Sequence, residues 1–462
     1  MPRMTPRPDS GSFRDPSGHV VVESGRVLRW VNASYRPHYD AFHDSEASRL
    51  LRERRLLVGY REIEPVPEGA YRLLETEKIP FVSYPYEWSF GQLQAAALLT
   101  LDIQLLLLEH GFTLKDATPF NVQFLGTRPV FIDLLSFEVL EPGRPWQAYR
   151  QFCESFLAPL LLMAHVDLDL GRLLQIHLDG IPLALCSALL PLSAKVRPKT
   201  YLHLVLHARL GASQRTDREP KAPRPVDTAS LAVIARQLRS LIAALEPRSD
   251  DSLWTEYYES HLNYTDEGIR HKKEVVETAL NELRPHTVWD LGCNVGLFSR
   301  ICAEAGAAVV AFDSDPSCVE RLFRRLREEQ EERILPLRLD LANPSPALGW
   351  DNRERRSLLD RGAADLVLAL GLTHHLRLTH NVPFAMQADF LSRCGSHLLV
   401  EYVGPDDEMV KRLARHKESL LADYSEASFL AAFEGHFSLG RRVAVADSQR
   451  VLFLLAATPR RD

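Results

Sequence analysis

Cysteine is scarce in this chain, and charge of one predominant sign is missing. The 462 residues contain six cysteines, which lack the close pairing of disulfide frameworks and the spacing of zinc sites. Several of them lie in apolar runs, so we expect reduced, buried thiols in a cytoplasmic protein. The formal net charge is −6, and no basic patch of the kind that nucleic-acid binding requires is evident.

Long uninterrupted hydrophobic runs are missing as well. The apolar stretches Phe156–Met163 and Ile181–Leu192 are interrupted by prolines and are much shorter than the ~20 residues of a membrane-spanning helix. We therefore expect core helices and no membrane partner. Residues 1–18 lack the apolar core of a signal peptide and are rich in Pro, Arg, Ser and Gly, a composition that predicts disorder.

A chain of this length exceeds one ordinary hydrophobic core, so at least two domains are expected. The clearest boundary is the polar and proline-rich stretch 211–230, which reads as an exposed linker. We predict an α+β domain over 19–210 and a helical joining or lid segment over 231–284. The remainder, 285–462, is predicted to be an α/β domain.

The most informative stretch is the seven residues from Asp290 to Gly296. It follows a short apolar run and precedes apolar residues at helical spacing, which predicts a tight turn from a strand into a helix. Gly292 and Gly296 permit a sharp turn and close approach of a ligand, and Asn294 tolerates a positive φ. By itself this pattern also fits a turn that binds nothing.

Acidic residues also end the next two predicted strands. Asp313 closes the second apolar run, and Asp340 with Leu341 closes the third. Because the carboxyl ends of parallel strands meet at one edge of an open α/β sheet, we expect the three acids to converge there. A carboxylate at the second position suits a ribose diol, and a short acid beside a leucine suits an adenine ring.

This constellation resembles the class I S-adenosylmethionine-dependent methyltransferases over about residues 255–460. The resemblance implies a Rossmann-like sheet of seven strands with S-adenosyl-L-methionine as cofactor. It implies that Asp290 faces the methionine part, that Asp313 binds the ribose, and that Asp340 and Leu341 contact adenine. Asn294 departs from the family pattern, since many members have the central glycine there.

A dinucleotide-binding dehydrogenase is the rival interpretation of the same turn. It would usually have glycine at position 294 and continue in parallel strand–helix units. Here the runs Leu439–Val445 and Arg450–Ala456 flank the polar residues 446–449, which predicts a terminal antiparallel hairpin. The methyltransferase fold ends in such a hairpin.

Three further residues are candidates for the reaction. His374 and His375 follow the fourth predicted strand, and in the resembled family the loop there faces the transferred methyl group. Histidine titrates near neutral pH, so either ring could contact or deprotonate the acceptor, although a supporting role is the alternative. Tyr264 lies in an aromatic segment before the first strand, where a lid over the cofactor, or simply core packing, is expected.

A second constellation lies in the N-terminal part. Asp116, Asn121 five positions later, and Asp133 at the end of an apolar strand resemble the catalytic loop and metal-binding acid of protein-kinase-like and aminoglycoside-phosphotransferase-like folds. The resemblance implies that Asp116 orients a hydroxyl and that Asn121 with Asp133 holds magnesium. No glycine-rich loop precedes them, so a non-catalytic relative of a kinase-like domain is the alternative.

As a whole, the chain resembles bacterial two-part methyltransferases related to nodulation proteins. The stretch from Pro80 to Phe90 and the residues around Asp116 contribute to this resemblance. It implies methyl transfer to a small-molecule or glycan-like acceptor. Two alternatives remain, namely a cofactor-binding scaffold without turnover and a phosphotransferase that uses the N-terminal segment.

Overall fold

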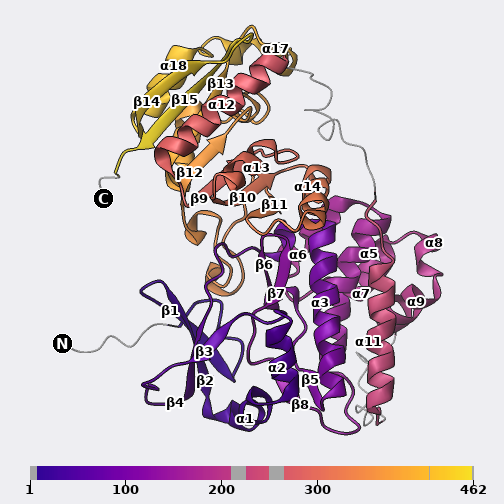
Figure 1. The fold of residues 1–462 in the computed structure, drawn as a ribbon. Coiled ribbons are helices and arrows are strands. Elements are labelled where there is room, and N and C mark those ends of the chain that lie inside the picture. Colours follow the sequence, from indigo (N-terminus) through magenta and orange to yellow (C-terminus); the bar gives the residue numbers. More distant parts are fainter. Residues whose placement is uncertain (1–7, 210–224, 249–264, 416, 460–462) are drawn as a thin grey trace. The chain divides into compact units, whose positions relative to one another are not determined.

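The computed structural model describes residues 8–209, 225–248, 265–415 and 417–459. They belong to two compact units, each with its own internal packing (Figure 1). The first comprises Met1–Ser249 together with Ala347–Arg355, and the second comprises Asp250–Pro346 together with Arg356–Asp462.

The first unit is an α+β structure that opens with a four-stranded antiparallel sheet in the order β1-β2-β4-β3. Two antiparallel strand pairs follow, β5 with β8 and β6 with β7. The strands are β1 (Gly18–Glu23), β2 (Arg26–Asn32), β3 (Tyr60–Glu62), β4 (Ala70–Thr76), β5 (Phe112–Leu114), β6 (Val122–Leu125), β7 (Arg128–Phe131) and β8 (Phe137–Val139).

Its helices are mostly short, apart from α3 and α11. They are α1 (Arg36–His43), α2 (Glu46–Glu53), α3 (Phe90–Glu109), α4 (Tyr149–Phe152), α5 (Ala158–His165), α6 (Leu173–Ile176), α7 (Leu183–Leu189), α8 (Leu192–Lys195), α9 (Pro198–Thr200) and α11 (Thr228–Ala243), with π-helical turns at Cys153–Leu157 and Tyr201–Leu206.

Helix α3 is the central helix of the first unit. Ser89 begins it by accepting a hydrogen bond from the Gln92 amide, and Gln92 caps the helix start in return. Among the described residues, α3 alone is long and apolar enough to cross a membrane, yet 78% of its most apolar window is buried. A helix that is apolar all round and surrounded by protein is a core helix.

Two predictions about segment boundaries are wrong. The expected disorder of residues 1–18 does not extend over 8–18, because the Asp9 amide donates to the Val20 carbonyl and β1 already begins at Gly18. The expected joining segment 231–284 is divided between the units. Helix α11 packs on α3, where Gln94 donates to the Ile242 and Leu245 carbonyls, whereas α12 belongs to the second unit.

Most of the predicted linker 211–230 lies outside the described residues, which resume at 225, and α11 already begins at Thr228. The predicted C-terminal domain 285–462 is interrupted as well. Residues 347–355, between β11 and β12, pack with the first unit, where the Arg355 guanidinium lies 4.2 Å from the Phe120 ring centroid.

The second unit is built on a seven-stranded sheet in the order β11-β10-β9-β12-β13-β15-β14. The first five of these strands are mutually parallel, and β15 runs antiparallel to both of its neighbours, β13 and β14. The predicted terminal hairpin is therefore confirmed. The strands are β9 (Thr287–Leu291), β10 (Ala308–Asp313), β11 (Ile334–Arg338), β12 (Ala364–Ala369), β13 (Gly395–Val403), β14 (Phe437–Ala444) and β15 (Arg450–Ala457).

Helices cover both faces of this sheet (Figure 1). One apolar cluster joins α12, α13 and α14 to inward residues such as Val288, Leu366 and Leu399, and on the other face Phe429 of α18 stacks on Phe453. The helices are α12 (Asp266–Leu283), α13 (Leu297–Glu304), α14 (Pro316–Glu328), α15 (Thr373–Leu378), α16 (Phe384–Cys394), α17 (Glu408–Ala414) and α18 (Glu426–Glu434).

Candidate active site

The turn between β9 and α13 has the strained backbone that the sequence predicted. Gly292, Asn294 and Gly296 all adopt positive φ angles of 81°, 52° and 82°. A Cβ on Gly296 would lie 2.6 Å from Leu322 Cδ1 of α14, so glycine is required there by both conformation and space. Asn294 adopts the left-handed conformation that it tolerates better than most residues.

Asp313, at the end of β10, is fixed against this turn. The Asn294 amide donates to its Oδ2 at 2.7 Å, and the Asp315 amide donates to its Oδ1 at 2.9 Å. Burial raises the pKa of Asp313 to about 6, although these amides act in the opposite direction. Each oxygen accepts one amide and has a second lone pair, so the carboxylate can still accept from two hydroxyls.

Asp290 lies beside it on β9 and is buried. The Ser299 hydroxyl of α13 donates to Asp290 Oδ2 at 2.6 Å. Burial raises the pKa of Asp290 to about 6, and the negative charge of Asp313 adds to the shift. The charge of one acid thus affects the ionisation of the other across adjacent strand ends.

The third acid lies at the same edge of the sheet. The Leu339 amide donates to the Asp313 carbonyl at 2.8 Å, which aligns the end of β11 with the end of β10. Asp340 follows, half-buried like Leu341, and its Oδ1 accepts the Ala342 amide at 2.9 Å. The structure therefore brings the three predicted acids to consecutive strand ends at one edge.

His374 and His375 begin a helix, whereas the sequence predicted a loop. They lie in the first turn of α15, with ring centroids 4.2 Å apart. Burial lowers the pKa of His375 to about 4, and it lowers the pKa of the fully buried His374 as well. Both rings are therefore neutral near pH 7, and the buried Nδ1 of His374 has no partner among the described residues.

A buried charge network next to these histidines was not predicted. Lys272 Nζ of α12 lies 2.9 Å from Glu401 Oε2 of β13, and both side chains are almost inaccessible to solvent. Arg450 Nε of β15 pairs with Asp407 Oδ2 at 2.9 Å. Burial lowers the pKa of His374 most, and the positive charges of Arg450 and Lys272 lower it further.

The only sequence signal for this network was a charged residue, Glu401, at the end of an apolar strand. Gly371 lies beside the buried charge network, since a Cβ added to it would be 3.6 Å from Glu401 Oε2. Leu372 follows it and lies against Gly292, whose added Cβ would be 3.7 Å from Leu372 Cδ1. The start of α15 is thus next to the glycine turn.

Tyr264, which was predicted to lie in a lid over the cofactor, falls outside the described residues.

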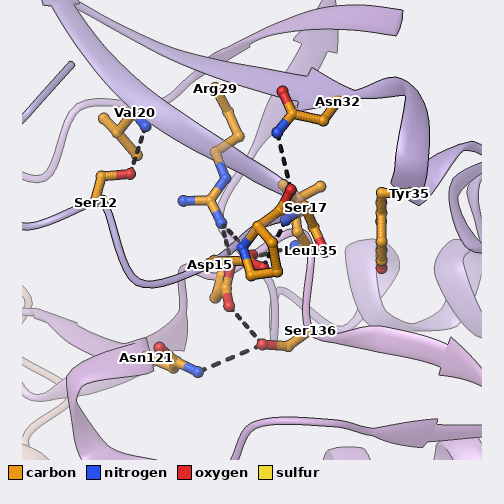
Figure 2. A network of polar contacts seen from close by, with 12 residues as sticks. Ser12, Asp15, Ser17, Val20, Arg29, Asn32, Tyr35, Asn121, Leu135 and Ser136 are labelled. Carbon is orange, nitrogen blue, oxygen red and sulfur yellow. Dashed lines mark hydrogen bonds and ion pairs between the residues drawn. The ribbon is translucent and has the colours of Figure 1, made fainter.

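The second predicted constellation is also brought together, in the first unit. Burial raises the pKa of Asp116, the negative charge of Asp133 raises it further, and Asn121 lowers it by hydrogen bonding. Asp133 Oδ1 lies 2.5 Å from Arg29 Nη2, and its Oδ2 accepts from Ser136. Figure 2 shows Asn121 donating to Ser136 in this network.

Arg29 thus supplies a positive charge beside Asp133. Within the described ranges, no group of three His, Cys, Asp or Glu residues is spaced to hold a metal ion. A role in magnesium binding or phosphate transfer, and the kinase-like resemblance itself, stay predictions.

Taken together, the strand order and the acidic edge define the second unit as a doubly wound α/β domain with the topology of class I methyltransferases. No family model matches the chain. Nodulation protein NoeA from Rhizobium meliloti (strain 1021) is 36% identical over 465 residues, which cover 97% of this chain and 96% of NoeA. The chain therefore belongs to the family of nodulation protein NoeA.

Solved structures show more distant likenesses. The N-methyltransferase NodS from Bradyrhizobium japonicum WM9 is 13% identical and covers 42% of this chain and 98% of NodS, with a TM-score of 0.32. Magnesium protoporphyrin IX methyltransferase from Synechocystis PCC 6803, solved with bound SAH, is 17% identical and covers 45% of this chain and 100% of its own, with a TM-score of 0.30. Likenesses this remote do not assign a function.

Proposed function

We propose that this protein transfers a methyl group from S-adenosyl-L-methionine to a small-molecule or glycan-like acceptor. The observation that carries the proposal is the position of Asp313, whose carboxylate is held by the amides of Asn294 and Asp315 at the end of the second parallel strand. A carboxylate fixed at this place in an open α/β sheet suits the two hydroxyls of a ribose.

The residues around Asp313 fit the rest of an adenosyl cofactor. Asp340 and Leu341 offer an acceptor for the adenine amine and an apolar side chain for the ring, and both are half-buried. The turn at Gly292 and Gly296 keeps side chains away from the backbone over which the cofactor would pass. Asp290 supports this turn through Ser299 and offers negative charge near the methionine end.

S-adenosylmethionine supplies an electrophilic methyl group attached to a sulfonium when it is bound. The protein's task is then mainly to align the acceptor, and precise alignment alone can supply much of the rate. We assign His374 and His375 to contact with the acceptor. Because both rings are neutral, a ring nitrogen can accept a hydrogen bond from an acceptor hydroxyl or amine and receive its proton.

We also propose that the protein acts in the cytoplasm. All six cysteines are buried thiols that form no disulfide, as expected for a reducing compartment.

The reaction can be tested before the acceptor is known. Lysates from cells that lack the protein would receive radiolabelled S-adenosylmethionine with purified wild type, His374→Ala or Asp313→Ala. We expect a labelled product with wild type that is lost with Asp313→Ala and strongly reduced with His374→Ala. His374→Ala should keep its affinity for the cofactor. Cofactor binding without any labelled product in any lysate fraction would contradict the proposal.

A further inference from the structure

The N-terminal strap, residues 9–17, precedes β1 and places Asp15 in a polar cluster with Arg29 and Ser17 (Figure 2). The Asp9 amide donates to the Val20 carbonyl at 2.7 Å, and the Val20 amide donates to Ser12 Oγ at 2.6 Å. These bonds fix the strap along β1 and direct Asp15 toward Arg29.

Two cations from different parts of the unit converge on Asp15. Lys115, which follows β5, places its Nζ 3.0 Å from Asp15 Oδ1 and donates to Ser17 Oγ at 2.7 Å. Arg29 of β2 places Nη2 3.5 Å from Asp15 Oδ2. All three charged side chains are mostly buried. One carboxylate therefore lies between a lysine and an arginine, as an anionic ligand would.

Asp15 fills this position incompletely. Its Oδ2 accepts no hydrogen bond, and the buried Nε of Arg29 has no partner among the described residues. Arg29 Nη2 lies closer to Asp133 Oδ1, at 2.5 Å, than to Asp15 Oδ2, at 3.5 Å, so Asp15 is held mainly by Lys115. A phosphate group has more acceptor oxygens, arranged tetrahedrally, and arginine with lysine is the usual pair for binding it.

The strap is held in place at its other end by a charged contact. Arg14 donates from Nε and Nη2 to the two carboxylate oxygens of Glu354, at 2.6 and 2.9 Å. Glu354 is buried and accepts from the Trp350 amide at 3.0 Å. Both partners belong to the first unit, because residues 347–355 pack with it. The residue next to Asp15 is thus fixed by a bidentate ion pair.

We propose that Arg29, Lys115 and Ser17 form a binding site for a phosphate-bearing ligand and that Asp15 is its built-in occupant. The ligand displaces the Asp15 carboxylate, and the strength of the Arg14–Glu354 ion pair determines how easily the strap moves away from the site. No phosphate transfer is required, and the site is independent of methyl transfer.

The test is calorimetric titration of the full chain with sodium pyrophosphate at constant ionic strength. Asp15→Ala should bind pyrophosphate at least tenfold more tightly than wild type, because the competing carboxylate is gone. Glu23→Ala is the matched control, since it removes one exposed negative charge at the end of β1 and should behave like wild type. Adding Lys115→Met to Asp15→Ala should abolish the gain.

Further variants separate the proposal from its alternatives. If Asp15→Ala proves unstable by thermal unfolding, Asp15→Asn removes the charge while keeping the shape, and it should show the same gain. Glu354→Gln should give a smaller increase in pyrophosphate affinity, because it weakens the contact with Arg14 and leaves the Asp15 carboxylate in place. Equal gains in Asp15→Ala and Glu23→Ala, no gain in Asp15→Asn, or equally tight binding of malonate would overturn the proposed phosphate site.

Discussion

Asp313 is the residue on which cofactor binding is expected to depend most. Asp313→Ala removes charge-assisted hydrogen bonds to the ribose and should weaken the affinity for S-adenosylmethionine by about 1–3 kcal/mol. Isothermal calorimetry measures this change. Glu304→Ala, which removes an exposed acid at the end of α13, should leave the affinity unchanged. An unaltered dissociation constant for Asp313→Ala would refute the ribose assignment.

The raised pKa values of Asp290 and Asp313, both about 6, predict a pH dependence of stability. An unfolded aspartate has a pKa of about 3.9, so the folded chain binds more protons than the unfolded chain between about pH 4 and pH 6. The free energy of unfolding that these groups contribute therefore falls as the pH rises through this window. Urea unfolding of the cofactor-free protein should show a weaker fall for Asp290→Asn than for wild type.

Asp406→Asn, a change of an exposed aspartate, serves as the control and should follow the wild-type profile. Cofactor affinity should change in the opposite direction and rise from pH 5 to pH 7, because the ionised carboxylates are the better acceptors. An Asp290→Asn profile identical to that of wild type would contradict the account of these buried acids.

At the scale of single residues, the sequence predicted the acids at the strand ends but not the buried cations near the site. Asp290, Asp313 and Asp340 were recognisable because each ends an apolar run and strand ends converge in an α/β sheet. Lys272 and Arg450 were not recognisable. Their burial depends on packing between a helix and strands that are far apart in sequence, and no local pattern reveals such pairing.

At the scale of elements, α12 is attached to the sheet by the Lys272–Glu401 ion pair as well as by apolar packing. Lys272→Met leaves Glu401 without its closest cation in a buried setting, which should cost about 3–5 kcal/mol of stability. Chemical denaturation measures the loss. The same substitution at the neighbouring Lys273 should cost less than about 1 kcal/mol. Equal effects at the two positions would show that the buried pair contributes nothing specific.

The elements around the site were predictable to within a few residues. The strands β9, β10 and β12 and the terminal hairpin follow from apolar runs of the expected length. The start of α15 was not predicted, because the resembled family led us to expect a loop at His374 and His375, and the helix is only six residues long. The sequence also failed to predict that residues 8–17 adopt a defined conformation. It depends on contacts of Asp15 and Arg14 with residues about 100 and 340 positions away.

At the scale of the whole molecule, the chain contains two units with separate cores. We therefore predict that Lys272→Met raises amide hydrogen exchange in α12, β13 and β15 while leaving α3 and β2 unchanged. Mass spectrometry of peptic peptides resolves these segments. Faster exchange throughout the first unit would contradict separate stabilisation of the two cores.

Two separate units were predictable from the length of the chain, but the predicted boundary at 211–230 was wrong, because α11 lies beyond that stretch and still belongs to the first unit, which continues to Ser249. The assignment of residues 347–355 to the first unit was not predictable, because nothing in their composition distinguishes them from an ordinary loop. Their place is determined by Glu354, whose burial is offset by Arg14. Sequence patterns thus predict elements and their order more readily than long-range charge pairs.

The central claim is that the acidic edge of the second unit binds an adenosyl cofactor. Calorimetric titration of the full chain with S-adenosylhomocysteine, the demethylated product, tests it most directly. We predict saturable binding of one molecule per chain that weakens in Asp313→Ala and persists in His374→Ala. The absence of binding by a folded wild-type chain, or equal binding by Asp313→Ala, would contradict the account.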